Sequence, residues 1–465
     1  MYPRFVVRDI ALTERPVAFR RPFRFGDVTL EAAPEAIVHA TIELEDGRRA
    51  TGAAAELMAP KWFNRNPALS PEETVAQLRC ALEFARELYL KHSFDTAFGL
   101  HAACCEHQIA RCARADIPAL AAAFGPAELD KAILDALLRA ANLDAYTGLK
   151  NNLAGLDARL TPDINDGIIG NFLASRTPVA RLLVRHTVGL DDTVEELAAT
   201  CATTGCRYFK VKLSGDPAHD RDRLAQVAQM LEALALDYRL TLDANEQYPS
   251  HAALSALVRA LLDDDAFSEV VQRLLYIEQP LPRAMTWEVP LGELARSFAF
   301  VIDESDAGYD AFPRALKLGY RGISSKACKG IYKSLLNGAR AAYWNAMDSA
   351  RAFLTAEDLT CQPGLSLQQD TALAAFHGVI HAERNGHHYV DGFAAAPEPE
   401  ARAFLARHPD LYERTGGVVR LALRDGAINF SSLGRAAGFA SAVAPDEVGR
   451  RAGETHSDTA KGYGT

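Results

Sequence analysis

Short apolar runs that end in ionisable residues repeat along the middle of the chain. These runs are rich in β-branched and aromatic residues, which is typical of strands. They lie at residues 182–189, 208–213, 238–243, 274–278, 298–303 and 322–325. Segments able to form helices, such as 220–236 and 252–262, lie between them. A strand and a helix alternating at intervals of roughly 25 to 35 residues predict parallel βαβ units.

The first 145 residues have a different pattern. Residues 1–60 alternate as strands do, and the turn sequence at 45–48 predicts a hairpin. Ser70, followed by a proline and by Glu73, is typical of the start of a helix. Further helical pattern continues to about Ala141. Strands followed by helices predict an α+β domain.

The charged residues that follow the apolar runs predict where the chemistry takes place. In a (β/α)8 barrel, side chains at the carboxyl ends of the strands converge on one mouth. Asp243, Glu278 and Asp303 would repel one another there unless a cation lay among them. Because the three donors are hard oxygens, Mg2+ or Mn2+ is favoured over zinc.

Lysines stand on both sides of these acids in the sequence. Lys210 and Lys212 are two residues apart on one strand, so their side chains share a face. Repulsion between their ammonium groups favours the neutral amine on one of them, and a neutral amine can act as a base. Lys326 follows the sixth run directly, whereas Lys329 is expected to open the next helix. We therefore expect Lys326, rather than Lys329, at the mouth.

Five short motifs occur in the order and at the spacing of the enolase superfamily. The chain resembles the muconate-lactonising-enzyme and dipeptide-epimerase branch (the mandelate racemase/muconate lactonizing enzyme family) over roughly residues 20 to 430. The matching motifs are Lys210-Val-Lys212, Asp243-Ala-Asn245, Glu278-Gln-Pro280, Asp303-Glu304-Ser305 and Lys326. The candidate seventh strand, at 352–359, carries no histidine, which favours two lysine bases over the His-Asp base of mandelate-racemase relatives.

The resemblance implies a fold and a reaction. The fold is α/β: a modified TIM barrel, (β/α)7β, with an α+β N-terminal capping domain. The reaction is Mg2+-dependent removal of the proton next to a carboxylate, which gives an enediolate. Asp243, Glu278 and Asp303 would be the metal ligands, and Lys212 and Lys326 would be bases on opposite faces of the substrate. Lys210 would tune Lys212, while Asn245 and Glu304 would support the metal ligands from behind.

Several further residues are candidates for contact with the substrate. Loops of the capping domain close over the barrel in this family, which makes Phe25, Lys61 and Trp62 candidates. Polar residues at the ends of the first, seventh and eighth runs could also reach the mouth. They are His186, Asp358 and Glu383.

Four segments are expected along the chain: a capping domain at 1–145, the barrel with the active site at 146–390, a segment that returns to the cap at 391–434, and a flexible tail at 435–465. The tail is rich in small and charged residues, and from Gly449 it has little to bury, so this stretch is expected to be disordered or draped on a neighbour. The 465 residues, of which 49% are hydrophobic, suffice for a large core.

Composition and charge limit the possible partners. The net charge of −10 argues against nucleic acid, no apolar run could span a bilayer, and the first residues are too polar for a secretory signal. We expect a cytoplasmic enzyme that acts on a small carboxylate and forms a homo-oligomer. The eight cysteines match no usual zinc spacing, including the cluster at 101–112, and are expected to be free thiols.

The sequence leaves the final product open. Two opposed lysines suit racemisation or epimerisation, and the same pair suits the dehydration of an acid sugar or a cycloisomerisation. A Schiff-base aldolase, in which Lys212 or Lys326 attacks a carbonyl, is a rival of another class, but it needs no metal and leaves the three acids unexplained. A non-catalytic binding descendant is a third possibility.

Overall fold

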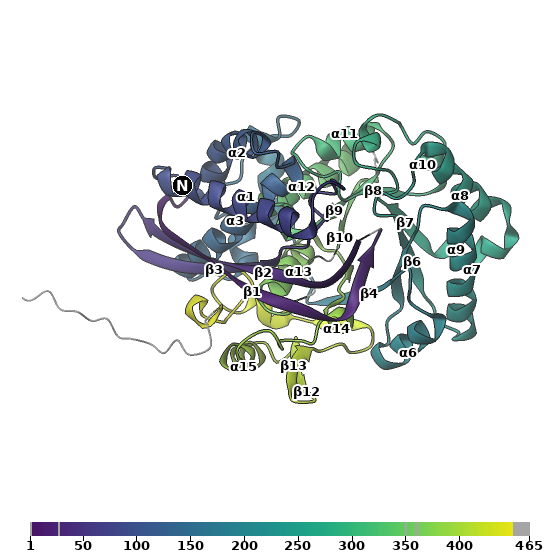
Figure 1. The fold of residues 1–465 in the computed structure, drawn as a ribbon. Coiled ribbons are helices and arrows are strands. Elements are labelled where there is room, and N and C mark those ends of the chain that lie inside the picture. Colours follow the sequence, from purple (N-terminus) through teal and green to yellow (C-terminus); the bar gives the residue numbers. More distant parts are fainter. Residues whose placement is uncertain (1, 27, 349–350, 358, 360–361, 450–465) are drawn as a thin grey trace, which may run out of the picture.

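The computed structural model describes residues 2–26, 28–348, 351–357, 359 and 362–449. It consists of an N-terminal antiparallel sheet with helices on one side and a curled, mostly parallel sheet with its own helices (Figure 1). The N-terminal sheet has the strand order β1-β2-β3 and is fully antiparallel. Its strands are β1 (Phe5–Phe25), β2 (Val28–Leu44) and β3 (Arg49–Leu57). The turn at 45–48 joins β2 to β3, which confirms the predicted hairpin.

Of three long helices in the described part of the cap, two (the first and third) pack on this sheet, and the second packs on those two helices. The three helices are α1 (Pro71–Lys91), α2 (Ala97–Ala113) and α3 (Ala119–Ala141). Ser70 and Glu73 form the predicted capping box at the start of α1, with each side chain bonded to the other's backbone N–H. Gly52 permits a close approach of β3 to α3, because a Cβ atom there would lie only 2.2 Å from the backbone of Ala132 and Ala136. Together with the sheet, the helices form the α+β cap.

The second sheet contains eight parallel strands in the order β10-β9-β8-β7-β6-β5-β4-β11, with β14 added antiparallel to β4. The strands are β4 (Arg181–Val188), β5 (Tyr208–Lys212), β6 (Arg239–Asp243), β7 (Leu274–Glu278), β8 (Phe300–Ile302), β9 (Gly322–Ser325), β10 (Phe353–Ala356), β11 (His381–Glu383) and β14 (Ala427–Asn429). The pairing of β11 with β4 curls the sheet into the predicted barrel.

Helices connect successive strands of the barrel and cover its outside. They are α6 (Val194–Thr204), α7 (Pro217–Ala233), α8 (His251–Asp263), α9 (Ser268–Arg273), α10 (Leu294–Ser297), α11 (Ala311–Lys317), α12 (Ile331–Asp348) and α13 (Leu365–His377). The short helices α4 (Ala145–Lys150) and α5 (Asp166–Ser175) join the cap to β4. After β11 the chain forms α14 (Gly386–Tyr389), α15 (Glu398–Arg407) and the hairpin of β12 (Tyr412–Thr415) and β13 (Val418–Leu421).

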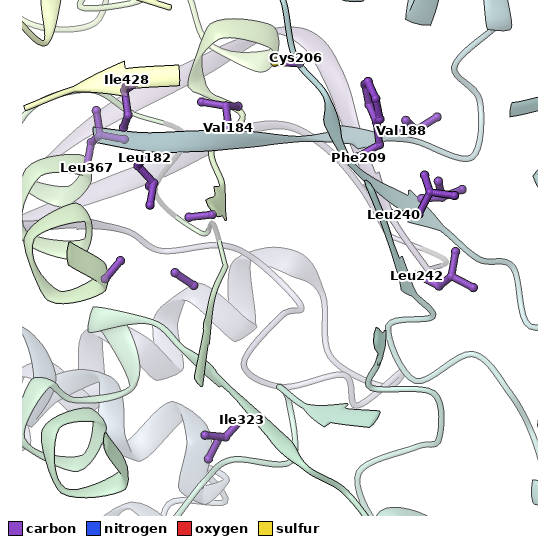
Figure 2. Close-up of a cluster of buried hydrophobic side chains, with 14 of the residues drawn as sticks. Leu182, Val184, Val188, Cys206, Phe209, Leu240, Leu242, Ile323, Leu367 and Ile428 are labelled. Carbon is purple, nitrogen blue, oxygen red and sulfur yellow. The ribbon is translucent and has the colours of Figure 1, made fainter. Parts of the chain in front are cut away.

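Alternation along the strands separates apolar from polar side chains. Leu182 and Val184 of β4, Phe209 of β5, and Leu240 and Leu242 of β6 belong to one buried apolar cluster (Figure 2). The residues between them point to the other face, into the barrel. The interior therefore receives the charged residues, including both lysines of β5.

The end of the described chain is packed. Phe439, Val443 and Val448 are buried, and the Asp135 carboxylate of α3 accepts a hydrogen bond from the backbone N–H of Phe439. Arg139 donates to the carbonyl oxygens of residues 441 and 443. The prediction of a flexible tail from residue 435 is thus wrong for 435–449, because Phe439 is buried in the core of the cap and Val443 and Val448 are buried with the barrel core.

None of the helices in the described ranges has both the length and the apolar character needed to cross a bilayer.

Candidate active site

The ends of neighbouring strands bring the predicted residues together. The register pairs Lys212 of β5 with Asp243 of β6, and Asp243 with Glu278 of β7. Asp303 directly follows β8, and Lys326 directly follows β9. Because these strands are parallel and adjacent, the five side chains meet at the same end of the barrel.

A narrow cavity, with about 450 Å3 of empty space that includes its opening to solvent, lies between this end of the barrel and the cap. Six charged residues and one amide come from the barrel: Lys210, Lys212, Asp243, Asn245, Asp303, Lys326 and Glu383. The cap contributes Phe19, Phe23, Phe25, Leu30, Leu57, Ala59 and Trp62, and Leu359 completes the wall. The centre of a water molecule can move within only about 20 Å3 of it, so the cap lies closed over the charged residues.

Lys210 lies at the centre of the acidic residues. Its Nζ is 2.9–3.0 Å from carboxylate oxygens of Asp243, Glu278, Glu357 and Glu383. Burial alone would lower the pKa of Lys210, but the four carboxylates outweigh it and hold the pKa well above its ordinary value. The expectation that repulsion within the lysine pair favours a neutral amine is therefore wrong for Lys210, because the acids around it were not counted.

Lys212 and Lys326 each have one close carboxylate partner. Lys212 Nζ donates to Asp243 Oδ2 at 2.6 Å and to Asn245 Oδ1 at 2.7 Å. Lys326 Nζ donates to Asp303 Oδ2 at 2.6 Å. Burial opposes the charge on Lys326, yet Asp303 raises the pKa of this amine above its ordinary value. On the barrel, β5 and β9 are separated by three strands, so the two amines reach the cavity from different sides.

Lys329 occupies a different place from Lys326. Its Nζ binds the carbonyl oxygen and Oδ1 of Asp303 from behind and lies 3.2 Å from Asp306. Lys326 lines the cavity and Lys329 does not, in agreement with the choice made from the sequence.

The donor set of the three acids is that of a magnesium site, but each acid is held by lysine here. Among the described residues, no three His, Cys, Asp or Glu side chains are close enough to share an ion. Glu278 nevertheless lies among other negative charges. Burial, Asp243 and Glu357 raise the pKa of Glu278 well above its ordinary value. Its Oε2 accepts no hydrogen bond, although Lys210 Nζ is 2.9 Å away. Oxygen ligands with unbalanced negative charge fit a divalent cation. To bind all three carboxylates, the cation would have to replace contacts that they now make with lysine.

A layer of amides fixes the strand ends. Asn245 links Lys212 to Glu304, because its Nδ2 donates to Glu304 Oε1 at 3.0 Å. Burial and the neighbouring Asp303 raise the pKa of Glu304 to about 7. The side-chain oxygen of Gln279 accepts hydrogen bonds from the backbone N–H groups of Asp303 and Ser305 at 2.9 and 3.1 Å. These two bonds fix the position of the Asp303 backbone.

The remaining predicted residues divide into three groups. Phe25, Trp62 and Glu383 line the cavity. Lys61 and His186 do not, and Asp358 lies outside the described residues.

Both misplaced residues have a physical explanation. Lys61 turns its amine to the carbonyl oxygens of Asn66 and Leu69 and so closes its own loop. His186 points away from the barrel interior, because its neighbours Arg185 and Thr187 take the inward face; its Nδ1 lies 3.2 Å from His387 Nε2 instead.

Some residues of the site were not singled out from the sequence. Glu357 follows β10 directly and binds both Lys210 and Arg185. Its position after an apolar run was the same signal that identified the other acids. The cavity-lining Phe23, Leu30 and Leu57 gave no such signal, because apolar residues in a sheet are usually core.

The comparisons with known proteins agree with this architecture. Residues 192–398 match the family model described as "Enolase C-terminal domain-like". Among curated protein sequences none matches the chain.

Several solved structures share the fold along nearly the whole chain. A dipeptide epimerase from Enterococcus faecalis V583, complexed with Mg and the dipeptide L-Leu-L-Tyr, is 18% identical, with a TM-score of 0.60, over 94% of this chain and 99% of that one. A muconate lactonizing enzyme from Pseudomonas fluorescens, complexed with muconolactone, is 16% identical, with a TM-score of 0.58, over 95% and 98%.

A mandelate racemase/muconate lactonizing protein from Herpetosiphon aurantiacus is 18% identical, with a TM-score of 0.56, over 94% and 98%. As with the other two structures, the similarity extends over both the cap and the barrel. Residues 192–398 are therefore similar to an enolase C-terminal domain, and the chain shares its fold, cap and barrel together, with solved proteins named mandelate racemase/muconate lactonizing protein, dipeptide epimerase and muconate lactonizing enzyme.

Proposed function

We propose that the protein is a magnesium-dependent enzyme that removes the proton next to a substrate carboxylate, and that it is a racemase or epimerase with two lysine bases. The observation that carries this proposal is the arrangement of Lys212 and Lys326, which line one cavity from strands β5 and β9. A planar carbon between two amines can lose a proton to one side and receive a proton from the other.

The acids supply the second requirement of this chemistry. A hydrogen next to a carboxylate is barely acidic, so negative charge that develops on the carboxylate must be stabilised. Asp243, Glu278 and Asp303 would hold a magnesium ion, which when bound supplies that stabilisation. The dipeptide epimerase of the same fold is itself complexed with Mg, which supports the choice of ion.

The other residues of the site would position these groups. Asn245 holds Lys212 at 2.7 Å, and Gln279 fixes the backbone of Asp303. Lys210 balances the negative charge of Glu357 and Glu383, so these two carboxylates need no cationic group of the substrate as a partner. The closed cap would exclude water, so that the proton exchanges with lysine rather than with solvent.

A cycloisomerase is the second candidate, because a muconate lactonizing enzyme shares the fold at a similar TM-score. Elimination of water from an acid sugar would use the same bases. In either reaction one lysine removes or returns the proton, and product analysis separates them from racemisation.

The test is proton exchange in D2O. Dipeptides, N-acyl amino acids and acid sugars would be incubated with the protein and Mg2+, and deuterium at the carbon beside the carboxylate would be measured by NMR. We expect Lys212→Ala and Lys326→Ala each to abolish turnover of the active substrate while Mg2+ still binds. Lys150→Ala, which removes an exposed lysine of α4, serves as the control. Near-normal activity in both site variants would refute the assignment.

A further inference from the structure

The walls of the cavity differ sharply in character. Among the described residues, every charged residue that lines it comes from the barrel, whereas all seven cap residues that line it are apolar. Phe25, Leu57 and Trp62 are at most 3% exposed, so this apolar wall is built into the fold. The part of a substrate that points away from the barrel would touch only hydrocarbon and aromatic rings.

The cations of the β1–β2 hairpin are engaged outside the cavity. Arg21 pairs with Asp192 and Glu196 at 3.2 and 3.0 Å, and Arg24 pairs with Asp191 at 2.9 Å. Alternation along β1 accounts for Arg24, because Phe23 and Phe25 line the cavity and the residue between them points away. Arg21 is kept from the cavity by its two ion pairs instead.

The other cations near the cap wall are also held elsewhere. Arg20 donates to the carbonyl oxygens of His387 and His388. Lys61 donates to carbonyl oxygens of its own loop. Arg65 lies 3.2 Å from Glu246 and 3.7 Å from Glu304, and its guanidinium is 5.2 Å from the ring centre of Phe25. Among the described residues, no cation of these cap segments lines the cavity.

Aromatic rings of the cap also cover the two amines. The ring centre of Trp62 lies 4.3 Å from Lys326 Nζ, and that of Phe23 lies 5.9 Å from Lys212 Nζ. Each ring gains a cation–π contact with the lysine below it. A substrate placed between the amines would therefore have an aromatic surface over its distal part.

On the basis of the proposed function, we propose that the substrate is a carboxylate whose remaining part is apolar and free of a second charge. A second carboxylate or ammonium group would be buried against this wall without a partner, and burial of an unpaired charge is costly. The hydroxyls of an acid sugar would meet the same difficulty, because each would lose its hydrogen bonds to water. Trp62 and Phe23 are the residues that set this preference.

The test compares matched probes in D2O with the full protein and Mg2+. N-acetyl-L-phenylalanine, N-acetyl-L-glutamate and D-gluconate share a carboxylate and differ in the distal part. We expect deuterium to enter N-acetyl-L-phenylalanine with a kcat/KM at least about tenfold above that of the other two. Exchange into N-acetyl-L-glutamate or D-gluconate at an equal or higher rate would overturn the substrate class and leave the proposed function intact.

If no probe exchanges deuterium, that result counts against the proposed function and not against the substrate class. A binding measurement then tests the substrate class separately. Calorimetric titration of the same probes then tests the wall alone: binding of N-acetyl-L-phenylalanine at least about tenfold tighter than the others supports the proposal, and equal or reversed affinities overturn it.

Two tryptophan variants test whether the cap wall causes the preference for an apolar probe. Trp62→Leu should reduce the ratio between the apolar and the acidic probe severalfold, whereas Trp287→Leu, a half-buried tryptophan that does not line the cavity, should leave it unchanged.

Discussion

A buried histidine in the cap provides a prediction whose sign and size follow from its contacts. His101 of α2 lies with its Nδ1 2.7 Å from Asp130 Oδ2 and its Nε2 2.7 Å from the hydroxyl of Tyr309 in the barrel. Tyr89 donates to the other oxygen of Asp130 at 2.9 Å. Burial would lower the pKa of His101, but the Asp130 carboxylate outweighs it and raises the pKa to about 10.

The raised pKa makes the free energy of unfolding depend on pH. Between the unfolded pKa of about 6.5 and the folded pKa of about 10, the folded protein holds one proton more than the unfolded chain. The stabilisation is therefore complete below pH 6.5 and is lost as the pH rises toward 10. The slope is about 1.4 kcal/mol per pH unit, which amounts to about 3 kcal/mol between pH 6.5 and 9.

The perturbation is His101→Gln, and the assay is urea denaturation at half-unit intervals of pH from 6.5 to 9. The wild type should lose its advantage over the variant at the slope given above. His219→Gln, which removes a histidine whose side chain is 59% exposed, should follow the wild-type curve. Parallel curves for wild type and His101→Gln would show that Asp130 does not hold the proton on His101.

Other predictions concern the site and its cover. Gln279→Ala should lower the free energy of unfolding by about 3 kcal/mol or more, because it leaves the buried N–H groups of Asp303 and Ser305 without an acceptor, and kcat should fall with it; an unchanged urea midpoint would contradict this role. Lys210→Met should cost about 3–5 kcal/mol, since four buried carboxylates lose their shared cation, and a variant as stable as wild type in urea would show that they carry no charge. Arg21→Ala should raise KM more than it lowers kcat, because it removes the contacts of the β1–β2 hairpin with Asp192 and Glu196; the difference from wild type should shrink in high salt, and a pure kcat effect would argue against closure.

The barrel and the convergence of its charged strand ends could be predicted because both depend on local patterns. Strand alternation fixes which residues share a face, so Lys210 and Lys212 must point to the same side of the sheet. The position directly after an apolar run likewise identified Asp243, Glu278 and Asp303. Glu357 directly follows β10 and obeys the same rule, although its neighbour Asp358 was the predicted residue.

Contacts between distant segments could not be predicted in this way. Phe23 and Leu57 look like ordinary core residues until the cap is placed on the barrel. His186 was misjudged because its strand could have presented either face, and only the partners of Arg185 and Thr187 decide which. The effect of four acids on Lys210 required knowledge of strands β7, β10 and β11 together.

The central claim is that Asp243, Glu278 and Asp303 share one divalent ion between Lys212 and Lys326. Crystals grown with Mn2+, with data collected at a wavelength where manganese scatters anomalously, test it most directly. We expect a single strong anomalous peak within about 2.0–2.5 Å of an oxygen of each of the three carboxylates, with both amines facing the space above it. A peak bound elsewhere, or three carboxylates that keep their lysine partners in saturating Mn2+, would contradict the account.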